Sequence, residues 1–593
     1  MARSVRSATL LVLALAALVV PVAQAQTPSA EDDVTLRVGT SANLITDNPF
    51  GVTSTADWEV TTIQYDMLLK FGSEDLSAQP SLAEGCEPSA DYMEWTCTLR
   101  EGLLWSDGSP LTSQDVAFSY RFVIDNNLPY YREYFPFEPR FETPDDRTLI
   151  WKATAPTFAP SMPAWVYIVP EEVWAPYDGL TREEIRSVPN APAVGSGPFV
   201  LTEWQDGEFW TMERNDHYWG EEPAIDRIEF RLYANQEAMV QALKIGEIDI
   251  ANDILPNLFS ALEGDPTITT HTTLSDWWLN LAFNFGGQGD QASNLPALGD
   301  LDVRRAIAMA IDKEDIAARA YGGTATPGDT VVRPASAFWH LDIAPDEELP
   351  FDPQAANALL DAAGYADTDD DGIREDPVTG DALTMEMPAS LETVGAVHAG
   401  QLIVGYLREI GIEVDLRAVD EAQMAEVWGS GDFDAYIWYW SGDPDPNYQL
   451  SVFTTPQCGG LSDGCFSDPV YDGLFEDQQA TMDVDERQTL VHEAQRRLYE
   501  QIPGIVLAYP GQLQAYRNDR FTGWTPAPGE QGKLIFGYNY DSYVSVEPVA
   551  AQGAASDDMG GVPRWTFVVA AAAAVVIVGF VVVRGRRDDE DEE

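Results

Sequence analysis

Basic residues are scarce in this chain, and their scarcity excludes one class of partner. The sequence has 34 Lys and Arg against 97 Asp and Glu, which gives a formal net charge of -63 over 593 residues. A chain with this charge repels phosphate backbones and lacks the basic surface on which nucleic-acid binding depends. Nucleic acid is therefore excluded as a partner.

Lysine is the rarer of the two basic residues, because arginine supplies most of the positive charge. The lysines are Lys70, Lys152, Lys244, Lys313 and Lys533. This balance suits very salty surroundings, since the screening length falls to roughly 3 Å in about 1 M salt and carboxylates then keep a surface hydrated without repelling one another. The alternative is biased codon usage with a merely acidic surface. Because 45% of the residues are hydrophobic and 11% aromatic, we expect a folded chain.

Signatures of catalysis are also scarce. No His-Glu-x-x-His is present, and the few histidines are scattered, so we expect ordinary surface or core roles for them. They are His217, His271, His340, His398 and His492. Carboxylate pairs are too common in this sequence to be informative. A secreted hydrolase that uses two carboxylates therefore stays open as an alternative, and so does a structural envelope protein.

Four cysteines are present, and none of them form the short Cys-x-x-Cys pairs of structural zinc sites. Outside the cell, disulfides are the expected state of such cysteines. Sequence alone allows three connectivities. We predict the local pairs Cys86 with Cys97 and Cys458 with Cys465, each of which would stabilise the fold by roughly 2.5 to 3 kcal/mol.

The N-terminus is typical of an export signal. Arg3 and Arg6 precede an apolar stretch, and Ala23-Gln24-Ala25 supplies the small residues that a signal peptidase needs. We therefore predict a signal peptide over residues 1–25. The mature protein would begin at residue 26 with a free N-terminus.

The C-terminus is typical of a membrane anchor. Trp565 to Val583 is an apolar run of about 19 residues, which is long enough to cross a bilayer as a helix. Arginines follow its inner edge, in the positive-inside arrangement for an extracellular N-terminal portion. We predict a linker over 549–563, a transmembrane helix over 564–583 and a cytoplasmic tail over 584–593. The alternative, a buried core helix, would need a surrounding domain that the short tail cannot provide.

Hydrophobic periodicity between these ends changes repeatedly between helical and strand types, which indicates an α/β protein of more than one lobe. A capping-box pattern begins a helix at Thr112 to Asp115. Further helices are expected at Asp302–Ala320, Pro353–Ala363, Val394–Ile410 and Asp485–Gln501, and strands at Val34–Thr40, Glu413–Ala418, Ala435–Tyr439 and Gly504–Ala508.

Four ordered blocks carry a resemblance to a known family. They are Leu99 to Val116, Val194 to Phe199 with Glu213-Arg214-Asn215 and Tyr218-Trp219 after it, Asp302 to Asp312, and Ala358 to Tyr365. Together they resemble the extracellular solute-binding proteins, family 5, of ABC importers, which bind peptides, nickel complexes and some sugars. The resemblance covers nearly all of residues 34–548.

Most residues of these blocks have structural roles. Gly195 and Gly197 are expected to permit turn dihedrals. Asp302 is placed to cap its helix, and Arg304 and Arg305 are expected on the exposed side of that helix.

The resemblance implies a two-lobed clamp of the periplasmic-binding-protein type, type II and class C cluster, with a hinge. Residues 26–548 would form the solute-binding domain. Lobe I would comprise about 34–272 and 510–548, and lobe II about 273–509. The implied function is a non-enzymatic receptor without a cofactor, a monomer anchored at the cell surface that captures peptides and delivers them to an ABC permease. The same role for a sugar or a metal chelate is the alternative.

The ligand site implied by the resemblance centres on the segment from Trp438 to Pro446. In peptide-binding relatives an aspartate shortly after a tryptophan pairs with the α-ammonium of the peptide, and Asp443 is the matching residue. Trp440 and Ser441 precede it, and Trp58 is the expected contribution from lobe I. The alternative is a loop in which Asp443 caps a turn.

One further motif resembles the front half of a calcium loop. Asp367, Asp369 and Asp371 alternate before Gly372, and Glu375 falls on position 9 of that pattern, although position 12 is Val378. Because the motif is incomplete, we expect a solvated acidic turn and no metal site, with calcium as the alternative.

Overall fold

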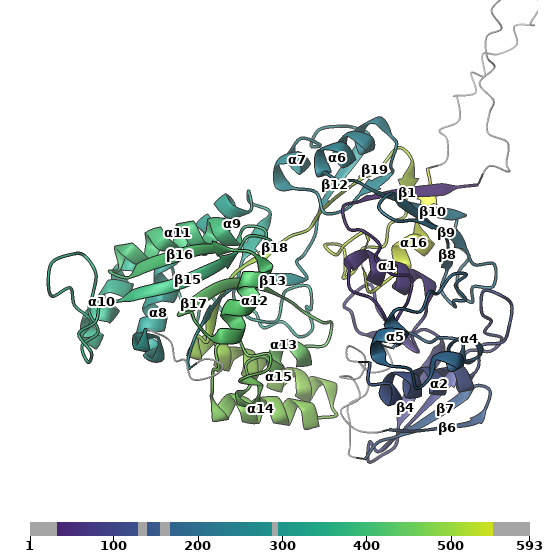
Figure 1. Ribbon diagram of the computed structural model, residues 1–593, viewed down its shortest axis with the longest axis horizontal. Coiled ribbons are helices and arrows are strands. Elements are labelled where there is room, and N and C mark those ends of the chain that lie inside the picture. The colour runs from purple at the N-terminus through teal and green to yellow at the C-terminus, as the bar shows by residue number, and fades with distance from the viewer. Residues whose placement is uncertain (1–32, 129–138, 155–165, 287–294, 536, 550–593) are drawn as a thin grey trace, which may run out of the picture. The chain divides into compact units, whose positions relative to one another are not determined.

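Two large sheets, built from different stretches of the chain, organise the described part of the protein (Figure 1). The computed structural model describes residues 33–128, 139–154, 166–286, 295–535 and 537–549. A smaller four-stranded sheet and two two-stranded sheets complete the sheets of these residues.

The first large sheet has seven strands in the order β12-β19-β11-β1-β10-β9-β8. Strand β1 (Thr35–Thr40) pairs in parallel with β10 and β11, and its Leu36 and Val38 pack in the same buried cluster as Val60 and Ile63 of helix α1. The other strands are β8 (Phe199–Gln205), β9 (Phe209–Arg214), β10 (Arg227–Leu232), β11 (Ile250–Ala251), β12 (Ile268–Thr272) and β19 (Leu513–Arg517). The helices in this part are α1 (Thr55–Gln64), α6 (Gln236–Ile245), α7 (Pro256–Ser260) and α16 (Asp541–Ser545).

The four-stranded sheet has the order β4-β5-β7-β6 and packs against helix α2 (Ser113–Asp125). Trp95 and Trp151 stack on one of its faces with ring centroids 5.8 Å apart. Its strands are β4 (Ala83–Pro88), β5 (Glu94–Leu99), β6 (Arg140–Asp145) and β7 (Thr148–Lys152). Nearby short elements are β2 (Leu69–Phe71), β3 (Ala78–Pro80), α4 (Glu171–Trp174) and α5 (Arg182–Arg186), whereas Phe521 of β20 (Phe521–Thr522), which pairs with β21 (Glu547–Pro548), packs in the cluster of the seven-stranded sheet.

The second large sheet has six strands in the order β14-β18-β13-β17-β15-β16. Its central strand β13 (Trp277–Phe283) is buried on both faces, because Leu279 and Leu281 join one hydrophobic cluster while Trp278 joins another. The other strands are β14 (Ala325–Pro327), β15 (Thr384–Ser390), β16 (Glu413–Val419), β17 (Ala435–Ser441) and β18 (Gly504–Pro510).

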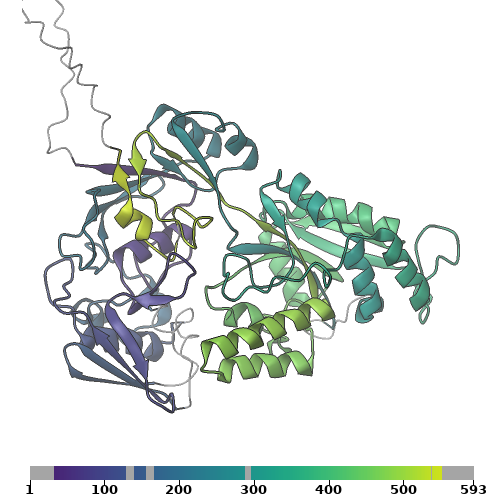
Figure 2. The same cartoon turned by 180° about the vertical axis from the view of Figure 1, so that it is seen from behind.

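Helices cover both faces of this sheet. One face packs against α8 (Leu301–Ala310), α9 (Lys313–Ala320), α10 (Pro353–Ala363) and α11 (Ala396–Glu409). The other packs against α12 (Glu421–Ser430), α13 (Asn447–Ser451), α14 (Pro469–Ala480) and α15 (Val484–Gln501). Helices α14 and α15 lie side by side in both views (Figures 1 and 2).

Two short segments cross between the large sheets, residues 273–276 from β12 to β13 and residues 511–512 from β18 to β19. They are joined by hydrogen bonds from the Thr273 amide to the Gln512 carbonyl (2.9 Å) and from the Gln512 amide to the Thr273 hydroxyl (3.2 Å). Gly511 lies so close to its neighbours that a Cβ would be 2.7 Å from the Thr273 carbonyl oxygen and 2.8 Å from that of Thr324. The crossing therefore requires glycine at this position.

Most expected elements are present. Strand β1, helices α10, α11 and α15 and strands β16, β17 and β18 match the predicted ranges within a few residues. The capping box at Thr112 and Asp115 begins α2 as predicted. The helix expected over Asp302–Ala320 is wrong in one respect, because it is two helices. Asp312 accepts a hydrogen bond from the Asp315 amide and so starts α9 after an extended residue at Ile311.

Two residues of the first of these helices also have roles other than those expected. Asp300, not Asp302, is the N-cap of α8, since its side chain accepts from the Asp302 amide. Arg304 is not on the exposed side. Its side chain is buried and donates to the carbonyls of Leu298 and Gln501. A buried arginine that donates to free carbonyls can occupy the same position in a helical sequence pattern as an exposed arginine. Periodicity alone therefore does not tell whether such an arginine is buried.

Gly195 and Gly197 are required for close packing rather than for turn dihedrals. A Cβ at Gly195 would lie 2.1 Å from the Gln64 carbonyl oxygen, and one at Gly197 would lie 2.2 Å from that of Ile63. Neither glycine is among the residues with positive φ. The reason given from sequence is therefore wrong, although glycine is needed at both positions.

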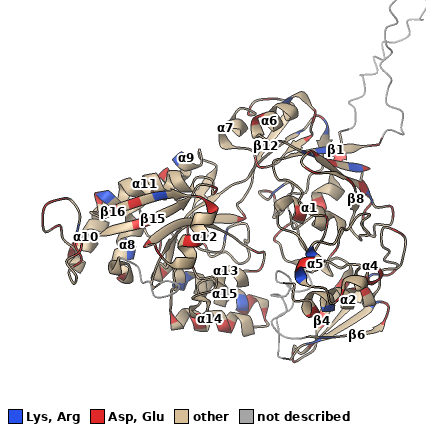
Figure 3. Cartoon of the chain, in the orientation of Figure 1, with Lys and Arg blue, Asp and Glu red and all other residues tan. Residues whose placement is uncertain are grey.

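Both predicted disulfides are confirmed, Cys86 with Cys97 and Cys458 with Cys465. The first joins directly opposed residues of β4 and β5. Acidic side chains are spread over elements around both large sheets (Figure 3).

The predicted signal peptide, linker, transmembrane helix and tail lie outside the described residues. Among the helices that the structure does describe, none is long and apolar enough to span a bilayer.

Candidate functional site

Asp443 lies at the point where β17 ends and the chain reaches the crossing between the sheets. The amide of Gly442 donates to the carbonyl of Asp276, in the first crossing segment, at 3.1 Å. Asp443 itself is half-buried. The strand and the crossing segment together therefore hold the backbone beside this carboxylate.

Arg333 is completely buried against the same turn. Its Nη1 donates to the Asp443 carbonyl oxygen at 3.2 Å, and the Gln449 amide nitrogen donates to that oxygen at 3.1 Å. Gly442 makes room for the guanidinium, because a Cβ there would lie 1.9 Å from Arg333 Nη1. Within the described residues, Nε and Nη2 of Arg333 have no hydrogen-bond partner. Two nitrogens of this buried arginine therefore lack a hydrogen-bond partner in the described part of the chain.

The ionisable groups around Arg333 come from three separate parts of the chain. Burial lowers the pKa of Arg333, while Asp276, Tyr538 and Asp443 favour its charged form. Burial alone would raise the pKa of Asp276, but Lys533 outweighs it and the net shift is downward. Lys533 Nζ lies 2.6 Å from Asp276 Oδ2. This ion pair joins the first crossing segment to the return segment of the chain, residues 524–540.

Tyr538 and Trp58 complete the surroundings of Asp443. Burial, followed by Asp443 and Asp276, raises the pKa of Tyr538, which also interacts with Tyr167. The ring of Tyr167 is 6.2 Å from that of Trp58 on α1, and its hydroxyl is 2.6 Å from that of Thr62. Trp58 is thus connected to Asp443 through Tyr167 and Tyr538.

Trp440 is held by protein groups. Its Nε1 donates to both carboxylate oxygens of Asp463 at 3.0 Å, and Asp463 also accepts from Tyr436 and Asn280. Burial raises the pKa of Asp463 to about 6, although all three hydrogen bonds act in the opposite direction. Trp440 packs beside Tyr448, and Ser441 is exposed. The indole N–H is therefore not available to a ligand in this arrangement.

Asp445, two residues after Asp443, has a structural role. Arg487 on α15 binds its carboxylate with both terminal nitrogens, at 2.6 and 2.8 Å. The pair is buried, and Arg487 outweighs the effect of burial to lower the pKa of Asp445. The Asp445 carboxylate is therefore occupied by a partner from α15.

The acidic loop, residues 367–375, brings its four candidate ligands together. One oxygen from each of Asp367, Asp369, Asp371 and Glu375 lies within 4.8 Å of the others. The loop also satisfies its carboxylates internally, because Asp367 accepts from the Gly372 amide and Glu375 from the Thr368 amide. Both the solvated turn and the calcium alternative stay predictions.

One Gly-x-Ser-x-Gly sequence runs from Gly460 to Gly464 and could suggest a hydrolase elbow. It lies inside the loop that Cys458 and Cys465 close, not between a strand and a helix. Ser462 is buried, and its hydroxyl accepts from the Cys465 amide. The segment therefore has a structural role.

Sequence reasoning missed Arg333, Lys533 and Tyr538. A charged residue directly after the buried pair Val331 and Val332 was a signal for Arg333, and lysine is rare enough here for Lys533 to stand out. No motif indicates that they meet, since they are brought together only when the return segment packs beside the crossing.

Comparisons with known proteins agree with this architecture. The sequence pattern of "Bacterial extracellular solute-binding proteins, family 5 Middle" matches residues 77–460. The nickel-binding periplasmic protein of Escherichia coli is 26% identical over 456 residues, 75% of this chain and 83% of that protein. Di/tripeptide-binding protein 2 of Pseudomonas aeruginosa is 26% identical over 489 residues, 78% and 87% respectively. The structure of a periplasmic oligopeptide-binding protein of Thermotoga maritima superposes with a TM-score of 0.74 at 23% identity, covering 88% of this chain and 100% of that one.

Proposed function

Since this chain belongs to the bacterial extracellular solute-binding proteins of family 5, a family of non-enzymatic transport receptors with a two-lobed fold, we propose that it captures short peptides for an ABC importer. The proposal rests on one observation: a carboxylate and a guanidinium lie together beside the crossing segment 273–276. Asp443 offers a carboxylate, and buried Arg333 offers two nitrogens without partners in the described chain. A peptide carries the complementary ammonium and oxygen acceptors.

Asp443 is proposed to bind the α-ammonium of the peptide. A carboxylate about 4 Å from an ammonium gains on the order of 4 kcal/mol at an effective dielectric near 20, against about 1 in bulk water. Asp443 is half-buried, so a ligand that excludes the remaining water would bring the interaction energy toward about 4 kcal/mol. Trp58 and Trp440 would provide apolar walls, and exposed Ser441 a polar edge.

Arg333 is proposed to donate to an oxygen of the same ligand, either a peptide carbonyl or the terminal carboxylate. Buried polar groups without partners are costly, so a ligand oxygen that reaches Nε or Nη2 removes an existing penalty. The Asp443 carbonyl, which also accepts from Gln449, holds the guanidinium against Gly442, and this reduces the entropy lost on binding.

Ligand binding is proposed to close two lobes about the crossing segments, the first comprising residues 34–272 and 510–548 and the second 273–509. Only residues 273–276 and 511–512 connect β12 to β13 and β18 to β19, and short connecting segments of this kind are where hinges form. Within the periplasmic-binding-protein folds, we propose that this chain belongs to type II, class C cluster. We also propose that segment 564–583 anchors the receptor at the cell surface, which membrane fractionation of the full chain and of residues 1–548 would test.

A metal chelate is the second candidate ligand, because one relative is named a nickel-binding periplasmic protein. A sugar is the third. Native mass spectrometry of protein purified without refolding distinguishes these candidates from a peptide by the mass of the retained solute.

Calorimetry with short peptides tests the proposed role of Asp443. Asp443→Ala is expected to weaken binding by about 2 kcal/mol or more, the cost of losing a buried charge partner. Acetylation of the peptide N-terminus should weaken binding to the parent chain by a similar amount and leave the variant unaffected. Exposed Asp432 on the same segment provides the control variant Asp432→Asn. Equal affinities for free and acetylated peptides would rule out the proposed role of Asp443.

A further inference from the structure

A second polar cluster lies on the segment that follows β14. It consists of Asp329, His340 and Asp342, whose facing oxygen and nitrogen atoms all lie within 4.8 Å of one another. His340 Nε2 is 3.6 Å from Asp329 Oδ2 and 3.3 Å from Asp342 Oδ1. The His340 side chain is only 8% exposed, whereas Asp342 is open to solvent. One imidazole nitrogen and two carboxylate oxygens therefore face one another, with His340 buried and Asp342 at the surface.

The orientation of the imidazole turns Nε2 toward the two carboxylates. His340 Nδ1 is 2.5 Å from the carbonyl oxygen of Val332. A carbonyl can only accept, so Nδ1 donates to it, and Nε2 is the ring nitrogen that faces Asp329 and Asp342.

The spacing fits a shared cation better than direct hydrogen bonds. Both distances from Nε2 exceed the usual range of about 2.7 to 3.2 Å for N–H···O bonds. Two ligands bound tetrahedrally to zinc at about 2.0 to 2.1 Å are roughly 3.3 to 3.4 Å apart. The observed distances lie close to that value.

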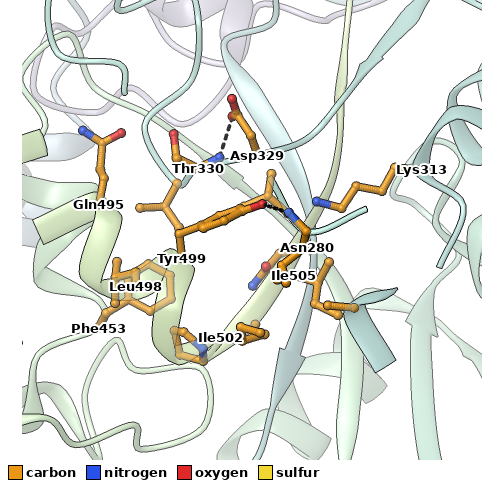
Figure 4. Close-up of a pocket in the computed structure, with 16 residues that line it drawn as sticks. Asn280, Lys313, Asp329, Thr330, Phe453, Gln495, Leu498, Tyr499, Ile502 and Ile505 are labelled. Atoms are coloured by element: carbon orange, nitrogen blue, oxygen red, sulfur yellow. Dashed lines mark hydrogen bonds between the residues drawn. The ribbon is translucent and has the colours of Figure 1, made fainter. Parts of the chain in front are cut away.

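The outer atoms of the cluster are held as metal ligands usually are. Asp329 Oδ1 accepts from the Tyr509 hydroxyl at 2.5 Å and from the Thr330 amide, which leaves Oδ2 to face His340 (Figure 4 shows the bond to Thr330). Lys313 is near Asp329, but its Nζ donates to the Gly328 carbonyl at 2.6 Å.

His492 on α15 adds an independent observation. Its ring interacts electrostatically with both His340 and Asp342. Its Nε2 is buried and has no hydrogen-bond partner among the described residues. His492 therefore brings a second imidazole, a donor type that zinc prefers, into the surroundings of the cluster.

We propose that Asp329 Oδ2, His340 Nε2 and Asp342 Oδ1 form a divalent-cation site of the zinc type. Mixed nitrogen and oxygen donors favour zinc over calcium or magnesium, which bind oxygen. The site is separate from Asp443 and from the acidic loop. Binding would join exposed Asp342 to part-buried Asp329, one on each side of Arg333 in the sequence.

Titration of untagged, chelator-treated protein with zinc chloride tests the proposal. One zinc ion is expected per chain, and Co²⁺ should give the visible absorption of a low-coordinate nitrogen and oxygen site. His340→Gln and Asp342→Asn should each weaken zinc binding by more than about tenfold, and Tyr509→Phe by about tenfold through loss of its hydrogen bond to Asp329. Asp342 is 98% exposed, so its variant should fold normally.

Three controls make the result specific. His398→Gln removes an exposed histidine elsewhere and should not change zinc affinity. Asp369→Asn tests the acidic loop, and Asp443→Ala tests the proposed peptide site, so neither should affect zinc binding. The absence of zinc binding, or equal affinity in the parent chain and in His340→Gln and Asp342→Asn, would overturn the proposal, whatever the peptide experiments show.

Discussion

Two acidic regions of this protein use their carboxylates in opposite ways. In the acidic loop, residues 367–375, exposed carboxylates accept hydrogen bonds from amides a few residues away. At the crossing, Asp276 and Asp445 are partly or fully removed from water, and their partners Lys533 and Arg487 lie 257 and 42 residues away in sequence. Exposed charges are stabilised by solvent and local backbone, whereas buried charges depend on a partner that the fold must deliver.

The largest expected effect on stability comes from breaking the buried ion pair of Arg487 and Asp445. Arg487→Met leaves Asp445 without its bidentate partner and should lower the free energy of unfolding by about 3 to 5 kcal/mol. Arg319→Met, which breaks an exposed helical pair with Asp315, should cost no more than about 0.5 kcal/mol. Denaturant unfolding of both variants measures the difference, and similar losses would show that burial does not distinguish the two pairs.

Glu59 is a buried carboxyl group whose effect on stability should depend on pH, unlike that of an exposed carboxylate. Burial raises its pKa from 4.5 to about 7, with a hydrogen bond from the Tyr543 hydroxyl acting in the opposite direction. The folded state therefore holds a proton more tightly than the unfolded chain, so stability from this group is complete below about pH 4.5 and is lost as pH rises through 7.

Glu59→Gln should accordingly reduce the decline in unfolding free energy between these pH values, by on the order of 3 kcal/mol for the full shift. The general repulsion of the acidic surface also grows with pH, but it is nearly the same in both proteins. Parallel stability curves for the parent and the variant would contradict the assignment.

Gly442→Ala tests how tightly Arg333 is held. The added Cβ would meet its guanidinium at 1.9 Å, and forced repacking of this kind costs about 1 to 3 kcal/mol. Peptide affinity should fall as well, because Arg333 must move. Gly405→Ala on α11, where a Cβ meets nothing within 4 Å, is the matched control and should be neutral or slightly stabilising. Thermal denaturation and calorimetry give the two readouts.

The smallest expected effect is in the acidic loop. Asp369→Asn removes one exposed charge and should change stability by less than about 0.5 kcal/mol in the absence of calcium. If added calcium raises the melting temperature of the parent chain and not of the variant, the loop is a calcium site after all.

Local patterns allowed much of the fold to be predicted. Periodicity and capping determined α10, α11, α15 and the start of α2, and the short spacings between cysteines favoured the two local disulfides over the other connectivities. The single helix predicted over Asp302–Ala320 failed because Asp312 can both continue a helix and cap a new one, and only packing selects between the two.

What sequence alone determined about this protein is therefore what depends on neighbours along the chain, namely helix starts, strand alternation, acidity and the family blocks. Tertiary structure decided which charges are buried and with which partners. Arg333, Lys533 and Tyr538 acquire their roles only because the return segment packs against the crossing, and His340 meets Asp329 only because the loop after β14 folds back on itself. The energy of a buried charge depends on atoms from distant segments, and no local pattern specifies them.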